Sequence, residues 1–176
     1  PGRLVGERYT PALVGQLGRV MAQLHDHASH FTLPTTSERD RTDWYRMADW
    51  RTLAPDGETI LSPDEQALCD RAAEHVANVI AQVDVRRDFG LIHSDLHFRN
   101  CLQHQGQLGV IDFDDCQFAP FSNDVAITLT YLDADPDYAA LRTAFVAGYQ
   151  QVRTLPDDHM VIDAFMVERG LRLILW

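Results

Sequence analysis

Lysine is absent from the 176 residues, cysteine is scarce and long apolar runs are missing. The three cysteines, Cys69, Cys101 and Cys116, form neither a disulfide framework nor a closely spaced metal-binding pair, so we interpret them as small core residues in a reducing compartment. No stretch approaches the roughly 18 apolar residues that a membrane span needs, and the N-terminus lacks a secretion-signal pattern. We therefore expect a cytoplasmic protein that does not contact a membrane.

Concentrated positive charge is missing as well. The formal net charge is −11 at pH 7, and the arginines form no basic run. Such a chain repels phosphate backbones, which argues against a nucleic acid partner, and its field favours a cationic small molecule. Hydrophobic residues make up 45% of the chain, enough for one substantial core, so we expect a single domain.

Helical spacing and capping residues predict helices over most of the chain. Thr10-Pro11 begins a helix that continues to about Leu24, and the capping box Ser62-Pro63-Asp64-Glu65 begins a second that ends near Val83. We also predict a short helix near 40–50 and three later helices, over 122–132, from 135 to about 152, and from 156 onwards. The predicted apolar faces are Leu13, Val14, Leu17, Val20, Met21 and Leu24 in the first helix, and Leu68, Ala72, Val76, Val79 and Ile80 in the second.

The pattern changes from helical to β-compatible between residues 89 and 113. Short apolar segments at 101–103 and 108–111 flank His104-Gln105-Gly106-Gln107, which is typical of a hairpin turn. Residues 90–92 form another short apolar segment. The fold class predicted from these patterns is α+β, predominantly α-helical, with a small β-hairpin.

The predicted hairpin gathers polar residues at one end. Asn100 enters the first strand and Asp112 leaves the second, so we expect them side by side, roughly 5 Å apart at Cα, with Asp95 in the loop just before. Oxygen ligands without a thiolate favour magnesium or manganese over zinc, and an incomplete shell leaves room for substrate phosphates. Singly, each residue is better explained as a turn or cap. Together, H-x-D-x-x-x-x-N, a hairpin and then apolar-Asp-Phe form the layout that phosphoryl transfer needs.

The segments from His93 to Asn100 and from Ile111 to Asp114 resemble the catalytic loop and metal-binding segment of the aminoglycoside phosphotransferase and choline kinase superfamily, relatives of the protein kinases. The resemblance implies that Asp95 is the catalytic base, that Asn100 and Asp112 bind Mg²⁺, and that His93 braces the loop. Asp124 resembles the aspartate that supports this loop from a helix start. The implied reaction transfers the γ-phosphoryl group of ATP to a hydroxyl of an amino alcohol, a homoserine-like compound, an aminoglycoside or a sugar-like compound.

Weaker similarities extend to the flanks. Gln23-Leu24-His25 is similar to the family's Leu-His helix ending, and Pro1-Gly2 resembles the Pro-Gly that follows the hinge strand between the two kinase lobes. We therefore expect residues 1–176 to form a single kinase-like C-terminal lobe without the N-terminal ATP-covering lobe. As an isolated piece it should have little or no activity.

Two histidine assignments stay open. His25-Asp26, followed closely by His27 and His30, matches the doublet of metal-dependent phosphohydrolases, although a polar helix end that interacts with the helix dipole is the favoured interpretation of this cluster. His97 either contacts substrate or shapes the loop, and the second interpretation is favoured.

The acceptor site is the least determined part. Asp114, Asp115 and Glu168 could hold an acceptor ammonium, or they could be solvated or structural. Asp114 replaces the glycine of the protein kinases' Asp-Phe-Gly, which favours a constitutively formed metal site. A non-catalytic, kinase-like regulatory or binding module is the alternative function. Aromatic residues that could line a cleft, or simply belong to the core, are Trp44, Tyr45, Trp50, Phe118 and Phe121.

Overall fold

The computed structural model describes residues 3–4, 9–30, 61–82, 88–155 and 159–174. The predicted short helix near 40–50, the aromatic residues Trp44, Tyr45 and Trp50, and the Pro1-Gly2 pair lie outside these ranges. Within them, no helix is both long enough and apolar enough to cross a membrane.

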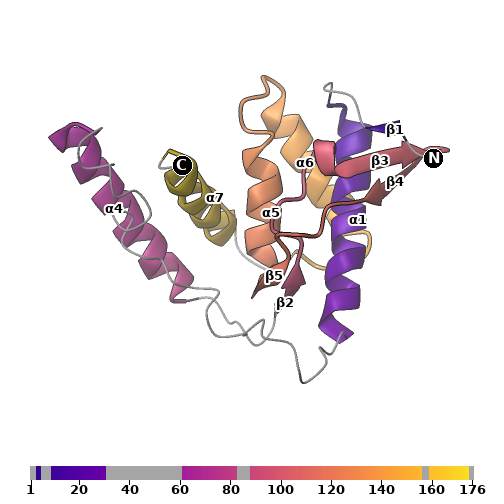
Figure 1. Ribbon diagram of the computed structural model, residues 1–176, viewed down its shortest axis with the longest axis horizontal. Helices are drawn as coiled ribbons and strands as arrows, with labels where there is room; N and C mark the ends of the chain where they lie inside the picture. The colour runs from indigo at the N-terminus through magenta and orange to yellow at the C-terminus, as the bar shows by residue number, and fades with distance from the viewer. Residues whose placement is uncertain (1–2, 5–8, 31–60, 83–87, 156–158, 175–176) are drawn as a thin grey trace.

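Helices dominate the described fold, with two small antiparallel sheets beside them (Figure 1). This confirms the predicted α+β, predominantly helical class. One sheet has the strand order β1-β3-β4 and the other pairs β2 with β5. The helices are α1 (Pro11–His30), α4 (Pro63–Ile80), α5 (Phe121–Thr130), α6 (Tyr138–Tyr149) and α7 (His159–Ile174), and the strands are β1 (Arg3–Leu4), β2 (Phe89–Ile92), β3 (Cys101–His104), β4 (Gln107–Val110) and β5 (Gln117–Pro120), with a 3-10 turn, η1, at Phe98–Asn100.

The main core lies where α1 crosses α6. Val14, Leu17 and Met21, from the predicted apolar face of α1, are fully buried. The helices approach closely because glycines face each other: a Cβ on Gly148 would lie 1.9 Å from the Gly15 carbonyl oxygen. The same pair of helices carries His25 on α1 and Tyr149 on α6, whose side chains lie 2.8 Å apart.

Helix α7 lies between α5 and α4 (Figure 1). Helix α4 begins with the predicted capping box, in which the Glu65 carboxylate accepts the Ser62 backbone N–H at 2.7 Å, and it ends at Ile80, three residues before the predicted end near Val83. The prediction that Leu68 belongs to its buried face is wrong, because Leu68 is 58% exposed and Cys69 is buried instead. Among the described elements, α4 packs mainly against α7, and its buried residues are Cys69, Val76 and Ile80.

No disulfide joins Cys69, Cys101 and Cys116. Cys69 and Cys101 are buried, as predicted, whereas Cys116 is only half-buried. Burial raises the pKa of the Cys101 thiol to about 11, so this thiol stays protonated near neutral pH.

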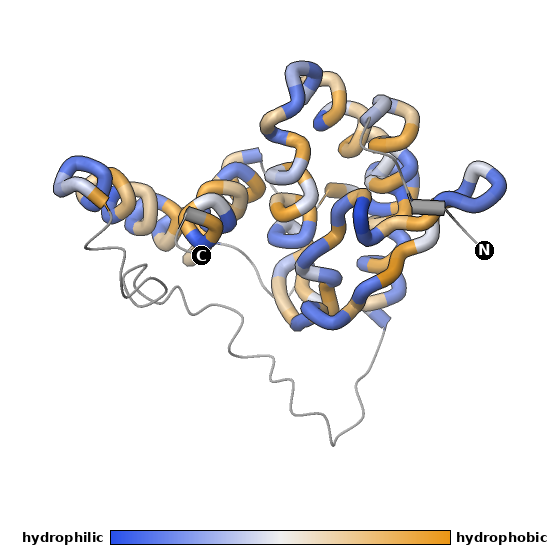
Figure 2. Tube along the Cα trace, turned by 45° about the horizontal axis from the view of Figure 1, so that its top comes forward, coloured by the Kyte–Doolittle hydropathy of each residue, from blue (hydrophilic) through white to orange (hydrophobic). Residues whose placement is uncertain are grey.

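The predicted hairpin is confirmed, with a correction to its end. Gln105 and Gly106 both have positive φ, 49° and 79°, as a two-residue type I′ turn requires. Figure 2 shows that the projecting tip is hydrophilic. Cys101 faces Val110, and the Ile111 N–H donates to the Asn100 carbonyl at 3.0 Å. The residue opposite Asn100 is therefore Ile111, and Asp112 comes one position later in a left-handed conformation, with φ 66°.

The starts of α5 and α6 differ from the prediction. Strand β5, which was not predicted, runs directly into α5, and the Phe121 N–H donates to the Asp88 carbonyl at 2.9 Å. The expected caps at 122–124 consequently lie inside the helix, where Asp124 has another role. Helix α6 begins at Tyr138, because Asp135 forms a turn in which its carboxylate accepts the Asp137 N–H at 2.9 Å.

Candidate active site

The loop between β2 and η1 is held from two neighbouring elements. Leu96 and Phe98 are buried in the core, and the Leu96 carbonyl accepts the Thr128 hydroxyl of α5 at 2.6 Å. Ser94 has a left-handed backbone, with φ 67°, and its hydroxyl accepts the side-chain amide of Gln117 on β5 at 2.8 Å. Asp95 therefore projects from a loop whose backbone is fixed on both sides of it.

Asp124 fixes the same loop from inside α5. Its side chain is fully buried, Oδ1 accepts the Ser94 N–H at 2.9 Å, and Oδ2 accepts the His93 N–H at 3.1 Å. Oδ2 also lies 3.1 Å from Nε2 of His25. Both carboxylate oxygens thus find donors inside the core, and two of these donors are backbone groups directly before Asp95.

His25 is a buried core residue, so the prediction of a polar helix end is wrong for His25, whereas His27 and His30 do lie exposed in the last turn of α1. Helix α1 continues to His30, and His25 is 0% exposed. Its Nδ1 lies 2.8 Å from the Tyr149 hydroxyl, and its ring stacks on Phe121 with the centroids 4.4 Å apart. Because the carboxylate of Asp124 can only accept, Nε2 carries the proton and Nδ1 accepts from the hydroxyl. Desolvation lowers the pKa of His25, with Asp124 opposing only in part.

The metal alternative for the His25-Asp26 doublet also finds no support. Within the described residues, no three or more His, Cys, Asp or Glu side chains group in a way that could hold a metal ion.

His93 links the two motifs. Its Nδ1 accepts the Asp95 N–H at 3.3 Å, so Nε2 bears the proton and donates to the Ile111 carbonyl at 3.1 Å. The ring also lies 4.8 Å from that of Phe113. One imidazole thus connects the backbone of Asp95 to the segment that carries Asp112.

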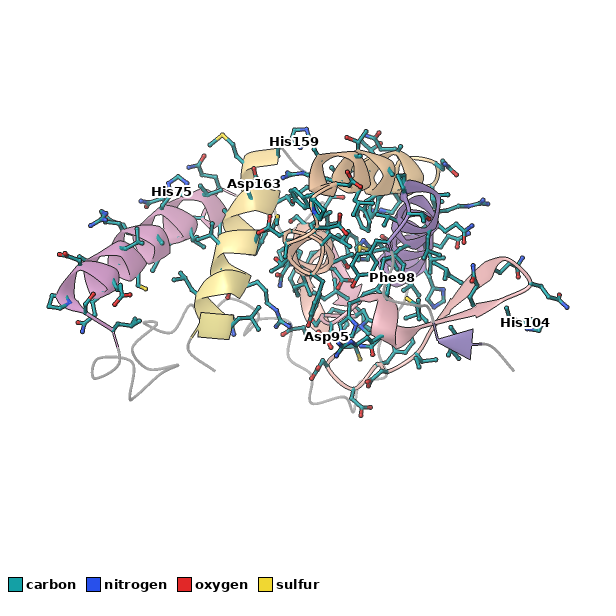
Figure 3. All side chains as sticks on the ribbon, turned by 90° about the horizontal axis from the view of Figure 1, so that it is seen from above. His75, Asp95, Phe98, His104, His159 and Asp163 are labelled. Carbon is teal, nitrogen blue, oxygen red and sulfur yellow. The ribbon has the colours of Figure 1, made fainter. Side chains whose placement is uncertain are left out.

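Both carboxylate oxygens of Asp95 have partners. Oδ1 accepts the Tyr131 hydroxyl at 2.7 Å and lies 3.3 Å from Nη2 of Arg169. Oδ2 lies 3.3 Å from Nε2 of His97 and 3.4 Å from Nδ2 of Asn100. In Figure 3, Asp95 lies between the end of α7 and the η1 turn. The carboxylate is therefore shared by the loop, α5's C-terminal end and α7.

His97 also shapes the loop. Its Nδ1 accepts the Arg99 N–H at 3.1 Å, which leaves the proton on Nε2 to face Asp95. This is the loop-shaping geometry favoured from the sequence. The same ring packs edge-on to Tyr131, with the centroids 4.5 Å apart.

Asn100 and Asp112 suit a hard divalent cation. The Asn100 carboxamide donates through Nδ2 to the Asp95 carbonyl at 3.0 Å, which leaves its Oδ1 as a free ligand atom. Asp112 is exposed and lies one residue beyond the Asn100–Ile111 pair. One amide oxygen and one carboxylate make an incomplete shell, of the kind that Mg²⁺ completes with waters and phosphates.

The other predicted acceptor residues are not gathered around Asp95. Asp114 and Asp115 are exposed in the turn after Asp112. Glu168 forms an ion pair with Arg172 on the same helix. Phe118 and Phe121 are buried, which confirms the core interpretation of these two aromatic residues.

Sequence reasoning missed Arg169 and Tyr131. They lie 74 and 36 positions from Asp95, so no local spacing connects them to it. For His25 a signal was present, because the buried positions Val14, Leu17 and Met21 continue at helical spacing to residue 25.

Similar proteins are kinases. A homoserine kinase of Azorhizobium caulinodans is 32% identical over 154 residues, which cover 83% of this chain and 45% of the relative. A solved amicoumacin kinase in complex with AMP-PNP and Ca²⁺ is 27% identical, with a TM-score of 0.76 over 98% of this chain and 53% of that one. A microcompartment-associated aminopropanol kinase is 29% identical, with a TM-score of 0.77 over 95% and 54%.

The chain spans about half the length of the curated relatives it matches, 51% and 45% of the first two. Over this shared half, the kinase-like lobe expected from the sequence agrees with the solved folds. The model of the phosphotransferase enzyme family matches residues 1–159, and the chain belongs to that family.

Proposed function

We propose that the protein carrying this chain is a small-molecule kinase, which transfers the γ-phosphoryl group of ATP to a hydroxyl of its acceptor. The main support is geometric: Asp95 and Asn100 share one braced loop, and His93 connects that loop to the Asp112 segment. Family membership and relatives named as kinases support the same reaction. Residues 1–176 supply the C-terminal lobe, and an ATP-covering lobe outside these residues completes the nucleotide site.

In this proposal Asp95 orients the acceptor hydroxyl and accepts its proton. The hydroxyl oxygen forms a bond to the γ-phosphorus while the bond to the β-phosphate oxygen breaks, so the products are a phosphate ester and ADP. Asn100 and Asp112 would hold Mg²⁺, which supplies charge neutralisation for the phosphates when bound. His93 and Asp124 keep Asp95 in place through the loop backbone.

The test is Asp95→Asn in the full-length protein. We expect kcat to fall by about 10²–10⁴-fold, because the amide cannot accept the proton, while the Kd for ATP changes little. ADP release is measured with amino alcohols, homoserine and aminoglycosides as acceptors. Asp133→Asn, an exposed carboxylate beyond α5, is the control and should retain wild-type turnover.

Unchanged turnover in Asp95→Asn removes that residue from the base role. A wild-type protein that phosphorylates none of these acceptors favours the alternative, a kinase-like binding module in which the internal partners of Asp95 are permanent.

A further inference from the structure

Arg169 on α7 holds Asp95 in an unusual way for an arginine. Its hydrogen bonds to the described residues run from one nitrogen: Nη2 lies 3.3 Å from Oδ1 of Asp95 and 3.2 Å from the Tyr131 hydroxyl. Its Nε is buried and has no hydrogen-bond partner among the described residues. The guanidinium side chain is mostly covered, with 23% of its surface exposed.

This geometry leaves donors unused beside the proposed base. A guanidinium presents five N–H groups in a planar fork that matches a carboxylate in a two-bond arrangement. An arginine that served only as a counter-ion to Asp95 would be expected to direct that fork at it. Here a single nitrogen is shared between Asp95 and Tyr131, and a buried charged donor without a partner is costly. Because 23% of the side-chain surface is exposed, an anionic group on a ligand can approach this incompletely used guanidinium.

The surroundings favour an anion over a cation at this end of α7. Glu168, the neighbouring acidic residue, is already neutralised by Arg172. The Tyr131 ring lies beside the guanidinium: Cζ of Arg169 is 6.0 Å from the centroid of that ring. Within the described part of the chain, the basic side chains that contact Asp95 are Arg169 and His97.

We propose that Arg169 binds a carboxylate of the acceptor, so that the acceptor is a small hydroxy acid such as a hydroxy amino acid. The inference rests on the proposed kinase function, in which the acceptor hydroxyl lies on Asp95. Because Arg169 touches Asp95 directly, the carboxylate and the hydroxyl of one three- or four-carbon molecule reach both residues. Arg169 is then the residue that distinguishes hydroxy acids from amino alcohols.

The kinases similar to this chain are named for acceptors of both kinds, with and without a carboxylate. Homoserine carries a hydroxyl and a carboxylate, whereas aminopropanol carries a hydroxyl and no carboxylate. L-Homoserine and 3-aminopropan-1-ol differ only in the carboxylate, as do L-threonine and 1-aminopropan-2-ol. These two matched pairs isolate the group that Arg169 is proposed to bind.

The experiment measures kcat/KM for both pairs with the full-length wild-type protein, Arg169→Ala and Arg169→Lys. We expect the wild type to prefer the carboxylated member of at least one pair by 10-fold or more, and the Ala variant to lose about 10- to 100-fold of that preference through KM. Lysine should restore only part of it, because it lacks the fork. Arg19→Ala, on the exposed side of α1, should leave the preference unchanged.

Binding titrations of the same compounds in the presence of Mg²⁺ and AMP-PNP separate this inference from the kinase function. Carboxylate binding that depends on Arg169 without any phosphoryl transfer supports the inference and contradicts the proposed kinase. A wild-type preference for the amino alcohols overturns the inference while leaving the kinase intact. It is also overturned if Arg169→Ala weakens both members of a pair equally, or if the wild type binds neither hydroxy acid.

Discussion

His25 shows how one side chain connects the helical core to the candidate catalytic loop. It lies between the Tyr149 hydroxyl of α6 and the Asp124 carboxylate, and Asp124 in turn accepts two backbone N–H groups of the loop. The imidazole works in its neutral form, because it must accept through Nδ1 while it donates through Nε2. A second proton would turn Nδ1 into a donor, so the Tyr149 hydroxyl would have to reverse its role and accept.

This requirement predicts a pH dependence of stability. Burial lowers the pKa of His25 below its ordinary value of about 6.5. Below about pH 6.5 the unfolded chain therefore binds a proton that the folded chain refuses, so the free energy of unfolding falls as the pH falls towards the folded-state pKa. Above that pH the contribution is constant. We expect the free energy of unfolding, measured by urea denaturation between pH 5 and 8, to change less with pH for His25→Gln than for the wild type.

His75→Gln on α4 provides the comparison, because His75 is exposed. The free energy of unfolding of this variant should change with pH in the same way as that of the wild type. If His25→Gln and the wild type give parallel pH profiles, the imidazole is not the group responsible.

At the scale of elements, the crossing of α1 and α6 tolerates no added side chain. A Cβ on Gly148 would lie 1.9 Å from the Gly15 carbonyl oxygen, and one on Gly18 would lie 2.1 Å from the Phe145 carbonyl oxygen. These neighbours are backbone atoms that can move only by separating the helices. The crossing also orients His25 and Tyr149 towards each other, so packing and site geometry depend on the same contact.

Gly148→Ala should therefore lower the free energy of unfolding by about 3 kcal/mol, because the helices must separate to admit the methyl group. Gly170→Ala on α7 is the matched control: its Cβ would meet nothing within 4 Å, so it should stabilise the helix by about 0.5–1 kcal/mol. Urea denaturation measures both. A Gly148→Ala protein as stable as the wild type would show that the crossing can adjust.

The elements themselves were predictable wherever the signal was local. The capping box at Ser62 and the turn at Gln105-Gly106 depend on a few adjacent residues, and both are confirmed. Strand β5 was not predictable, because its pairing with β2 is set by a partner more than 20 residues earlier. The exposure of Leu68 likewise depends on which face of α4 packs against α7, which no periodicity reveals.

At the scale of the whole molecule, the residues of the candidate site likewise divide into those that local sequence predicts and those that it does not. The sequence places Asp95, Asn100 and Asp112 near one hairpin, since one short stretch and one turn bring them together. Arg169 reaches Asp95 from a helix that packs between α5 and α4, so its position depends on the complete arrangement of helices. The residue that we propose to determine acceptor preference therefore comes from a distant element, which is why the reaction class was clearer from the sequence than the acceptor.

Arg153 also connects elements that are distant from one another in the sequence. From the segment after α6, it donates to the Ser29 hydroxyl at 2.7 Å and to the Asp88 carboxylate at 3.3 Å, and its Cζ lies 4.9 Å from the centroid of the Phe121 ring. One side chain thus joins the C-terminal end of α1, the start of β2 and the start of α5. Its surface is 17% exposed, so solvent only partly weakens these contacts.

Arg153→Ala should lower the free energy of unfolding by about 1–3 kcal/mol, because it removes charged hydrogen bonds and leaves Asp88 without this partner. Arg153→Lys should recover less than half of the loss, since an ammonium cannot bind both oxygens and stack on Phe121 at once. Urea denaturation at moderate ionic strength measures the three proteins, with Arg19→Ala on the exposed side of α1 as a control expected within about 0.5 kcal/mol of the wild type. A lysine variant as stable as the wild type would show that Arg153 stabilises the fold through its positive charge alone.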